Sequence, residues 1–207
     1  MDNSQMELRI QYFDRICIEV LGEFLGDHDF EIEDGSELGV TWYRDDCFLE
    51  LLYYPEDAPN FSPMVSVGLS KYRADGMRVR DGLGLWKVIP DEHPGRNYST
   101  WCFSNEVELR SVIERIRDNL IEPFALPLIL NKSRLSGLLD IQRREVEEEH
   151  AKAVQSQLLS DARASYSSGE FEAALGLFSR LDPGAMLSSD IKKMEIARKR
   201  TTGSHTR

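Results

Sequence analysis

The chain has 207 residues, of which 41% are hydrophobic and 29% charged, and it carries a net charge of −11. This composition excludes an intrinsically disordered chain and suffices for one domain with an appendage or for two small domains. The first twenty residues are interrupted by charged side chains, which argues against a signal peptide or membrane span there. Three cysteines without a CxxC pair fit a reducing compartment. We therefore expect a cytoplasmic protein that does not bind a membrane.

The negative charge is concentrated at the start of the chain. Residues 1–60 carry 16 acidic and 3 basic side chains, whereas residues 61–207 carry 20 and 22. A field of this sign repels the phosphates of nucleic acids and favours a basic protein partner. The alternative is that the charge only keeps the protein soluble. We predict a protein partner and no direct binding of nucleic acid.

A first helix is predicted to begin at Ser4, which has the spacing of a capping box with Glu7. Apolar residues then recur at three- and four-residue steps, so that they share one face of the helix. Gly26 is expected to end this helix, because glycine readily takes the left-handed conformation.

The hydrophobic period then changes to two, which predicts strands. Residues 30–42 form a predicted hairpin, and residues 47–54 are apolar on both faces except at Glu50, as in a central strand. Residues 64–69 are a further strand, and three more segments are candidates: 78–80, 83–89 and 98–103. Because the connections are short, neighbouring strands are expected to be antiparallel.

A closing helix is predicted to be capped by Ser104 and to be bent or ended by Pro123 and Pro127. The sequence therefore predicts an α+β fold, in which an N-terminal helix and a closing helix pack an antiparallel β-sheet over residues 1–131. Residues 132–155 form a predicted connecting helix, because a helix this charged is not buried on all sides.

The segment 158–183 has the small residues, aromatic residues, turn glycine and closing proline of a helical hairpin: Ala162, Ala174, Tyr166, Phe171, Phe178, Gly169 and Pro183. It resembles one tetratricopeptide repeat, a helix-turn-helix unit used for protein binding. The second helix is about three residues shorter than in that family, and no second full repeat follows. The resemblance implies a C-terminal helical appendage over residues 156–207, with a terminal helix and a basic tail. The alternative is a purely structural helix pair.

The sequence contains no recognisable catalytic, nucleotide or zinc motif. The pair Gly82 and Gly84 lacks the third glycine of a pyrophosphate loop, and no GxSxG sequence occurs. Cys47 lies in an apolar strand, where burial makes a thiol unreactive. We therefore predict no enzyme, no cofactor and no metal. The alternative is a metal-dependent enzyme of unfamiliar type that uses one histidine and four aspartates in turns: His28, Asp29, Asp34, Asp45 and Asp46.

Two groups of residues are candidates for a protein-binding surface. The first is acidic and consists of Asp27, Asp29, Glu31, Glu33, Asp34, Glu37, Asp45 and Asp46. The second combines aromatic rings with arginine, the residue types enriched at interface hot spots, and consists of Trp86, Arg96, Tyr98 and Trp101. The alternative is that they belong to the core and rim of a sheet, which is the more frequent role of alternating aromatic residues.

An acidic α+β domain with a short helical appendage resembles, in architecture and charge, the small immunity proteins of bacterial toxin systems. The resemblance implies neutralisation of a basic toxin effector by an acidic inhibitor. The alternative is an adaptor or regulatory subunit that docks through its C-terminal helices. The basic tail, residues 185–207, carries six basic and two acidic side chains and is also able to drive head-to-tail self-association.

Overall fold

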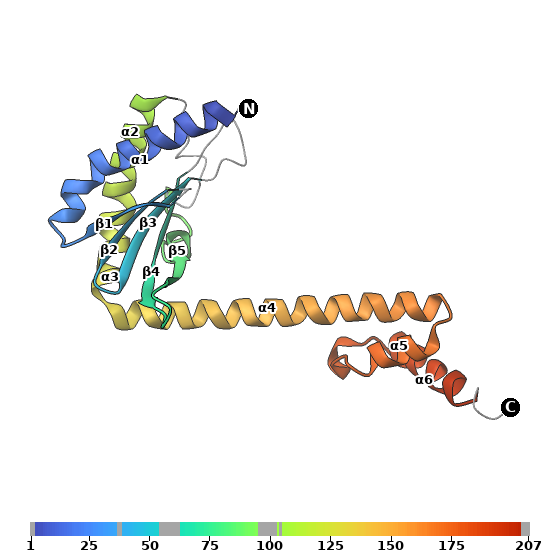
Figure 1. Cartoon of the computed structure of the whole chain (residues 1–207). Coiled ribbons are helices and arrows are strands. Elements are labelled where there is room, and N and C mark those ends of the chain that lie inside the picture. The colour runs from blue at the N-terminus through green and yellow to red at the C-terminus, as the bar shows by residue number, and fades with distance from the viewer. Residues whose placement is uncertain (1–2, 37–38, 54–62, 95–102, 104, 204–207) are drawn as a thin grey trace. The chain divides into compact units, whose positions relative to one another are not determined.

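A computed structural model describes residues 3–36, 39–53, 63–94, 103 and 105–203 (Figure 1), with the backbone alone for 3–11, 33–36, 53 and 203. The chain divides into two compact units, residues 1–142 and 143–207. The elements are α1 (Asn3–Gly26), β1 (Glu31–Ser36), β2 (Gly39–Arg44), β3 (Cys47–Tyr53), β4 (Pro63–Tyr72), β5 (Arg78–Gly84), η1 (Leu85–Lys87), α2 (Glu106–Ile116), η4 (Arg117–Ala125), α3 (Leu126–Leu130), α4 (Lys132–Ser167), α5 (Phe171–Phe178), η5 (Pro183–Ala185) and α6 (Ser188–Gly203). This architecture confirms the predicted α+β fold with a helical C-terminal part.

The described strands form one antiparallel sheet of five strands in chain order, β1-β2-β3-β4-β5. Strand β3 is central, as predicted for residues 47–54, and its Leu49 lies opposite Trp42 on one side and Val67 on the other. The fifth strand was only partly predicted. It runs through residues 78–84, and Leu85–Lys87 form a 3-10 turn instead of continuing a strand. Of the candidate strand 98–103, residues 98–102 lie outside the described part.

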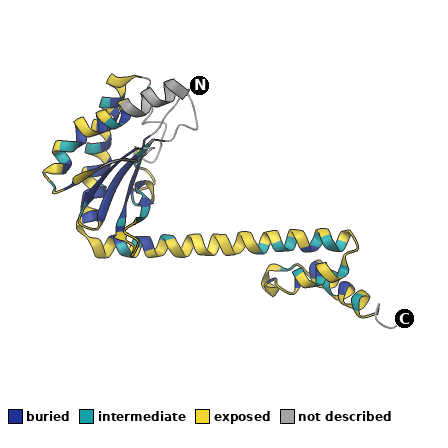
Figure 2. Ribbon diagram, viewed as in Figure 1, coloured by how far each residue is buried: buried dark blue, intermediate teal, exposed yellow. Residues whose placement is uncertain are grey.

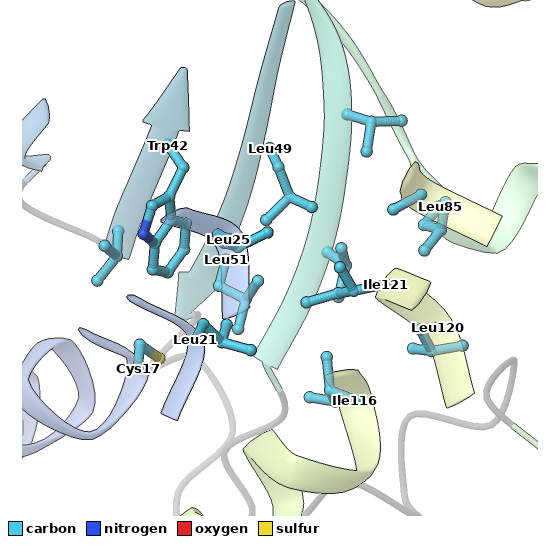
Figure 3. Packing of buried hydrophobic residues seen from close by; sticks show 14 of the residues in the cluster. Cys17, Leu21, Leu25, Trp42, Leu49, Leu51, Leu85, Ile116, Leu120 and Ile121 are labelled. Carbon is cyan, nitrogen blue, oxygen red and sulfur yellow. The ribbon is translucent and has the colours of Figure 1, made fainter. Parts of the chain in front are cut away.

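The inner face of the sheet is covered by helices and forms the core of the first unit. Figure 3 shows sheet residues such as Trp42 and Leu51 against Leu21 of α1 and Ile116 of α2. Strand alternation supplies the sheet side of this core: Val40, Trp42, Leu49, Leu51, Val65, Val67 and Leu83. The opposite, outer face therefore carries the residues between them.

The turn after α1 differs in one respect from the expected geometry. Helix α1 ends at Gly26, as predicted, but Asp29 is the residue in the left-handed conformation, with φ of 62°. The amide of Phe30 donates to the carbonyl of Leu25, which closes the end of the helix. Aspartate tolerates this conformation better than most residues.

The closing helix departs from its prediction at its start, and Pro123 falls in an irregular segment after it. Asn105 caps α2, because its side chain accepts a hydrogen bond of 2.9 Å from the amide of Glu108, and the predicted cap Ser104 lies outside the described residues. Pro123 does not end the helix but lies within the π-helical segment η4. Pro127 occupies the first turn of α3, where its missing amide costs nothing.

Within the second unit, the last turns of α4 pack on α5 and α6. The turn between α4 and α5 contains Gly169 with φ of 83°. Ala162 and Ala174 are fully buried, and Tyr166 meets Phe171 edge to face at 5.5 Å. The middle of α4, residues 143–154, is exposed throughout (Figure 2). The predicted connecting helix and the first helix of the predicted hairpin are thus one continuous element.

One ion pair fastens α6 to α4. The carboxylate of Asp190 is fully buried and accepts two hydrogen bonds from the guanidinium of Arg163, at 2.8 and 2.6 Å. It also accepts the amide of Leu187 at 3.1 Å, so that it caps the start of α6. The bonds from Arg163 hold the pKa of Asp190 below its ordinary value.

We expect Gly68→Ala to destabilise the first unit. A β-carbon at Gly68 would collide with the backbone of Asp81 and lie 2.6 Å from the ring of Phe48. Overpacking of this kind costs about 3 kcal/mol. All three tryptophans lie in residues 1–142, so urea unfolding followed by tryptophan fluorescence reports on this unit.

The control is Gly137→Ala in α4, where an added β-carbon meets nothing within 4 Å. It should raise stability by about 0.5–1 kcal/mol, since alanine is the better helix former. If Gly68→Ala and the unsubstituted protein were equally stable, the close approach of β4 to β5 at Gly68 would be contradicted.

We expect Asp190→Asn to destabilise α6 by roughly 3 kcal/mol, the low end for a buried pair because Arg163 is partly exposed. Since the pKa of Asp190 is lowered on folding, its contribution is present above the unfolded pKa of about 3.9 and is lost as pH falls through the lower folded value. Hydrogen exchange of the α6 amides from pH 3 to 7, corrected for intrinsic rates, measures both effects.

Asp190→Asn should remove the loss of α6 protection that the protonation of Asp190 causes at low pH. Glu195→Gln, an equal charge change at an exposed position of α6, should leave α6 protected. Full protection of α6 in Asp190→Asn would refute the structural role of the pair.

Candidate functional site

Five of the eight predicted acidic residues lie at one end of the sheet. Two follow α1, one begins β1 and two form the β2–β3 turn, and all five are exposed: Asp27, Asp29, Glu31, Asp45 and Asp46. The pairing of Glu31 with Tyr43 brings the start of β1 beside this turn. We call these five residues the acidic surface.

The remaining predicted acidic residues are not part of this group. Glu33 and Asp34 lie further along β1, and Glu37 lies outside the described residues. With a rise of about 3.3 Å per residue, the end of β1 at Ser36 is roughly 17 Å from Glu31. The predicted acidic residues that the structure describes therefore extend from the β2–β3 turn along β1.

A cavity of about 480 Å³ opens in the acidic surface. Three carboxylates, two tyrosines, an isoleucine and an arginine line it: Asp29, Glu31, Asp45, Tyr43, Tyr72, Ile32 and Arg78. The tyrosines and the arginine come from β2, β4 and β5, so the cavity extends from the turns onto the outer face of the sheet. Sequence reasoning identified its carboxylates but missed the other four residues.

Arg78 is stacked on the aromatic wall of the cavity. The carbon at the centre of its guanidinium lies 3.4 Å from the ring centroid of Tyr43 and 5.1 Å from that of Tyr72. Its Nε donates to the hydroxyl of Ser70 at 3.3 Å. Cations bind to aromatic faces in this way, so the wall has the chemistry that suits a guanidinium.

Two carboxylates of the cavity are held by unusual backbone geometry. Asp29 and Asp45 are the non-glycine residues with positive φ in the described part of the chain, at 62° and 56°. Such residues are uncommon and concentrate where structure or function demands them. Each lies in a tight turn, so the turns fix where the two carboxylates enter the cavity wall.

The acidic surface is partly neutralised by cations of the chain itself. Asp29 lies 3.6 Å from Arg44, and Lys132 pairs with Asp46 and, at 3.7 Å, with Asp45. The hydrogen bond from Lys132 lowers the pKa of Asp46, and the same bond raises the pKa of Lys132.

Two carboxylates of the acidic surface, Asp27 and Glu31, have no ion-pair partner among the described residues. Ion pairs this exposed contribute about 0–1 kcal/mol each, so a partner is able to displace them. Even with Arg44, Arg78 and Lys132 included, the five carboxylates leave an excess of negative charge.

Glu50, beside this surface on the outer face, is not available to a partner. It is 7% exposed and pairs with Arg80. The hydroxyl of Thr41 donates to Glu50 at 3.1 Å and accepts from Arg80 at 3.1 Å. A buried carboxylate needs hydrogen-bond donors, and Thr41 and Arg80 supply them to Glu50. These bonds connect strands β2, β3 and β5 on the outer face.

The second predicted group lies elsewhere. Trp86 is in η1, directly after β5, with 41% of its side chain exposed and the ammonium of Lys87 at 5.6 Å from its ring. Trp86 follows the end of β5 that is opposite to Arg78, and it is not among the residues that line the cavity. Arg96, Tyr98 and Trp101 lie outside the described residues.

The described residues contain no group of three or more His, Cys, Asp or Glu arranged to hold a metal ion. His28, from the metal alternative, bonds through Nδ1 to the carbonyl of Phe24 at 2.8 Å.

Among the described residues, no helix has the length and hydropathy to cross a membrane. No protein-family model, curated protein or solved structure matches the chain.

We expect Cys47 to resist alkylation in the folded protein. Burial, and then the charge of Asp46, raises the pKa of this thiol to about 11. At pH 8 only about one molecule in a thousand then carries the reactive thiolate. Mass spectrometry after iodoacetamide treatment at pH 8 should find Cys47 unmodified in the native protein and modified in urea. Rapid native labelling of Cys47 would contradict its burial behind Lys132 and Ile129.

Proposed function

We propose that the chain is a non-catalytic protein-binding protein whose acidic surface captures a basic segment of a protein partner. The observation that supports this is the cavity in that surface, in which Asp29, Glu31 and Asp45 surround a wall formed by Tyr43 and Tyr72. Arg78 already covers Tyr43, but Tyr72 is 67% exposed. The carboxylates therefore match the charged head of a lysine or arginine side chain, and Tyr72 offers a flat surface for its stem.

The distribution of charge between the two units supports the same partner class. Residues 1–142 carry 26 acidic and 14 basic side chains, a net charge of −12, whereas residues 143–207 carry 10 and 11. The field of the protein therefore originates in the unit that contains the cavity. Such a field accelerates encounter with a basic partner and orients it.

Within this class, a basic toxin effector is the partner we favour. An inhibitor of a toxin must reach its target before damage is done, and association steered by charge is the fastest kind. A preformed cavity adds orientation to that steering. We propose that the two proteins meet in the cytoplasm.

A second candidate function is an adaptor that docks through its C-terminal unit. The observation that favours it is a groove of about 690 Å³ between α4 and the loop before α6, with Ala151, Leu159 and Ala185 among its lining residues. Gln155 accepts the amide of Asp182 at 2.9 Å and holds the two walls together. Grooves of this kind accept an amphipathic helix, as the resemblance to a tetratricopeptide repeat implies.

The test uses fluorescein-labelled hexa-arginine and fluorescence anisotropy at 50 and 200 mM salt. The double variant Glu31→Gln, Asp45→Asn should weaken binding about tenfold at low salt, because each lost carboxylate removes about 0.7 kcal/mol. The control is Glu114→Gln with Glu122→Gln, an equal charge change at exposed positions of the helical layer. It should change affinity less than twofold.

Equal weakening by both double variants would mean that only net charge matters, and the acidic surface would then not be a site. The absence of hexa-arginine binding at 50 mM salt would refute the proposed function outright.

A further inference from the structure

Strand β1 is an edge of the sheet (Figure 1), and among the described residues it pairs with β2 alone. The backbone amides and carbonyls on its other side are a template for an additional strand. Edge strands are usually protected by charged side chains, especially lysine, by proline, by a bulge or by a covering element. The charges of β1 are acidic, so they repel another acidic strand but not a basic one. Residues 31–33 contain neither lysine nor proline.

The side chains of β1 alternate between the two faces of the sheet. Glu31 lies opposite Tyr43 and belongs to the outer face, where it lines the cavity. Ile32 lies opposite the core residue Trp42, so strand alternation directs it toward the inner face, but at this edge it is 46% exposed and also contributes to the lining of the cavity. The edge therefore presents acidic groups together with an uncovered apolar side chain.

We propose that β1 accepts an extended segment of a basic protein as a sixth strand. This inference rests on the proposed function and specifies its geometry. Basic residues of the segment would lie on the outer face, beside Glu31 and the cavity, and the residue between them would be apolar and cover Ile32. Backbone hydrogen bonds supply affinity in such complexes, and alternate side chains supply specificity.

Charge decides between this occupant and a second copy of the chain. Pairing of two β1 strands would bring the acidic residues of one against those of the other, and like charges on neighbouring strands are destabilising. A basic segment instead meets opposite charge at the same positions. The register shift between Glu33 and Ser36 limits regular pairing to residues 31–33, so the recognised segment is short.

The experiment compares two labelled peptides by fluorescence anisotropy with the full-length protein. The first is acetylated Arg-Val-Arg-Val-Arg, and the second has the same sequence with every backbone nitrogen methylated. Methylation keeps the charges and side chains but removes the amide donors that a strand needs. We expect the methylated peptide to bind at least tenfold more weakly. We also expect hydrogen exchange of the β1 amides to slow when the first peptide binds.

Substitution at the edge provides a matched comparison. Ile32→Ser should weaken binding of the first peptide three- to fivefold, because the apolar cover is lost without a change of charge. The control is Ile18→Ser in α1, whose side chain has almost the same exposure, 44% against 46%. It should leave affinity unchanged.

Two outcomes overturn the inference and differ in what they leave intact. Equal affinity for both peptides, with no change in β1 exchange, would remove strand addition but keep the acidic surface as a binding site. Failure of both peptides and of hexa-arginine to bind would remove the proposed function together with the inference.

Discussion

The register between β1 and β2 is the constraint on which the candidate site depends. Pairing of Glu31 with Tyr43 places the start of β1 beside the β2–β3 turn, so carboxylates from separate turns share one cavity. A shift of one residue would reverse the faces of Glu31 and Ile32 and move the carboxylate from the cavity to the helical side. Burial of Phe30, the residue directly before β1, opposes that shift, because the slip would turn its ring out of the core.

The elements of the fold were largely predictable because burial leaves a local pattern. The apolar run of residues 47–54, interrupted only by Glu50, identified the central strand, and the three- and four-residue spacing identified α1. Details that depend on one hydrogen bond were not predictable. The choice of Asn105 over its neighbour as helix cap, and the π-helical segment that accommodates Pro123, have no distinct sequence signal.

The sequence predicted that the candidate site is acidic, but it did not predict which residues come together to form it. Sequence identifies a run of acidic residues, yet their convergence depends on strand pairing between residues far apart in the chain. Tyr72 and Arg78 join Asp29 across more than 40 positions, and the partner of Glu50 is 30 residues away. For the C-terminal unit the spacing of small and aromatic residues was informative, whereas the Arg163–Asp190 pair had no local signal.

The stacked position of Arg78 has a consequence for selectivity. Arg78 already lies on Tyr43 and is covalently part of the protein. A cation that enters the cavity must therefore compete with Arg78 for the aromatic wall. A free amino acid or a small polyamine gains little from what remains of that wall. A polypeptide that engages several positions at once is affected much less, since the loss at one contact is distributed over many. The proposed function therefore implies a cavity that selects macromolecules over abundant small cations.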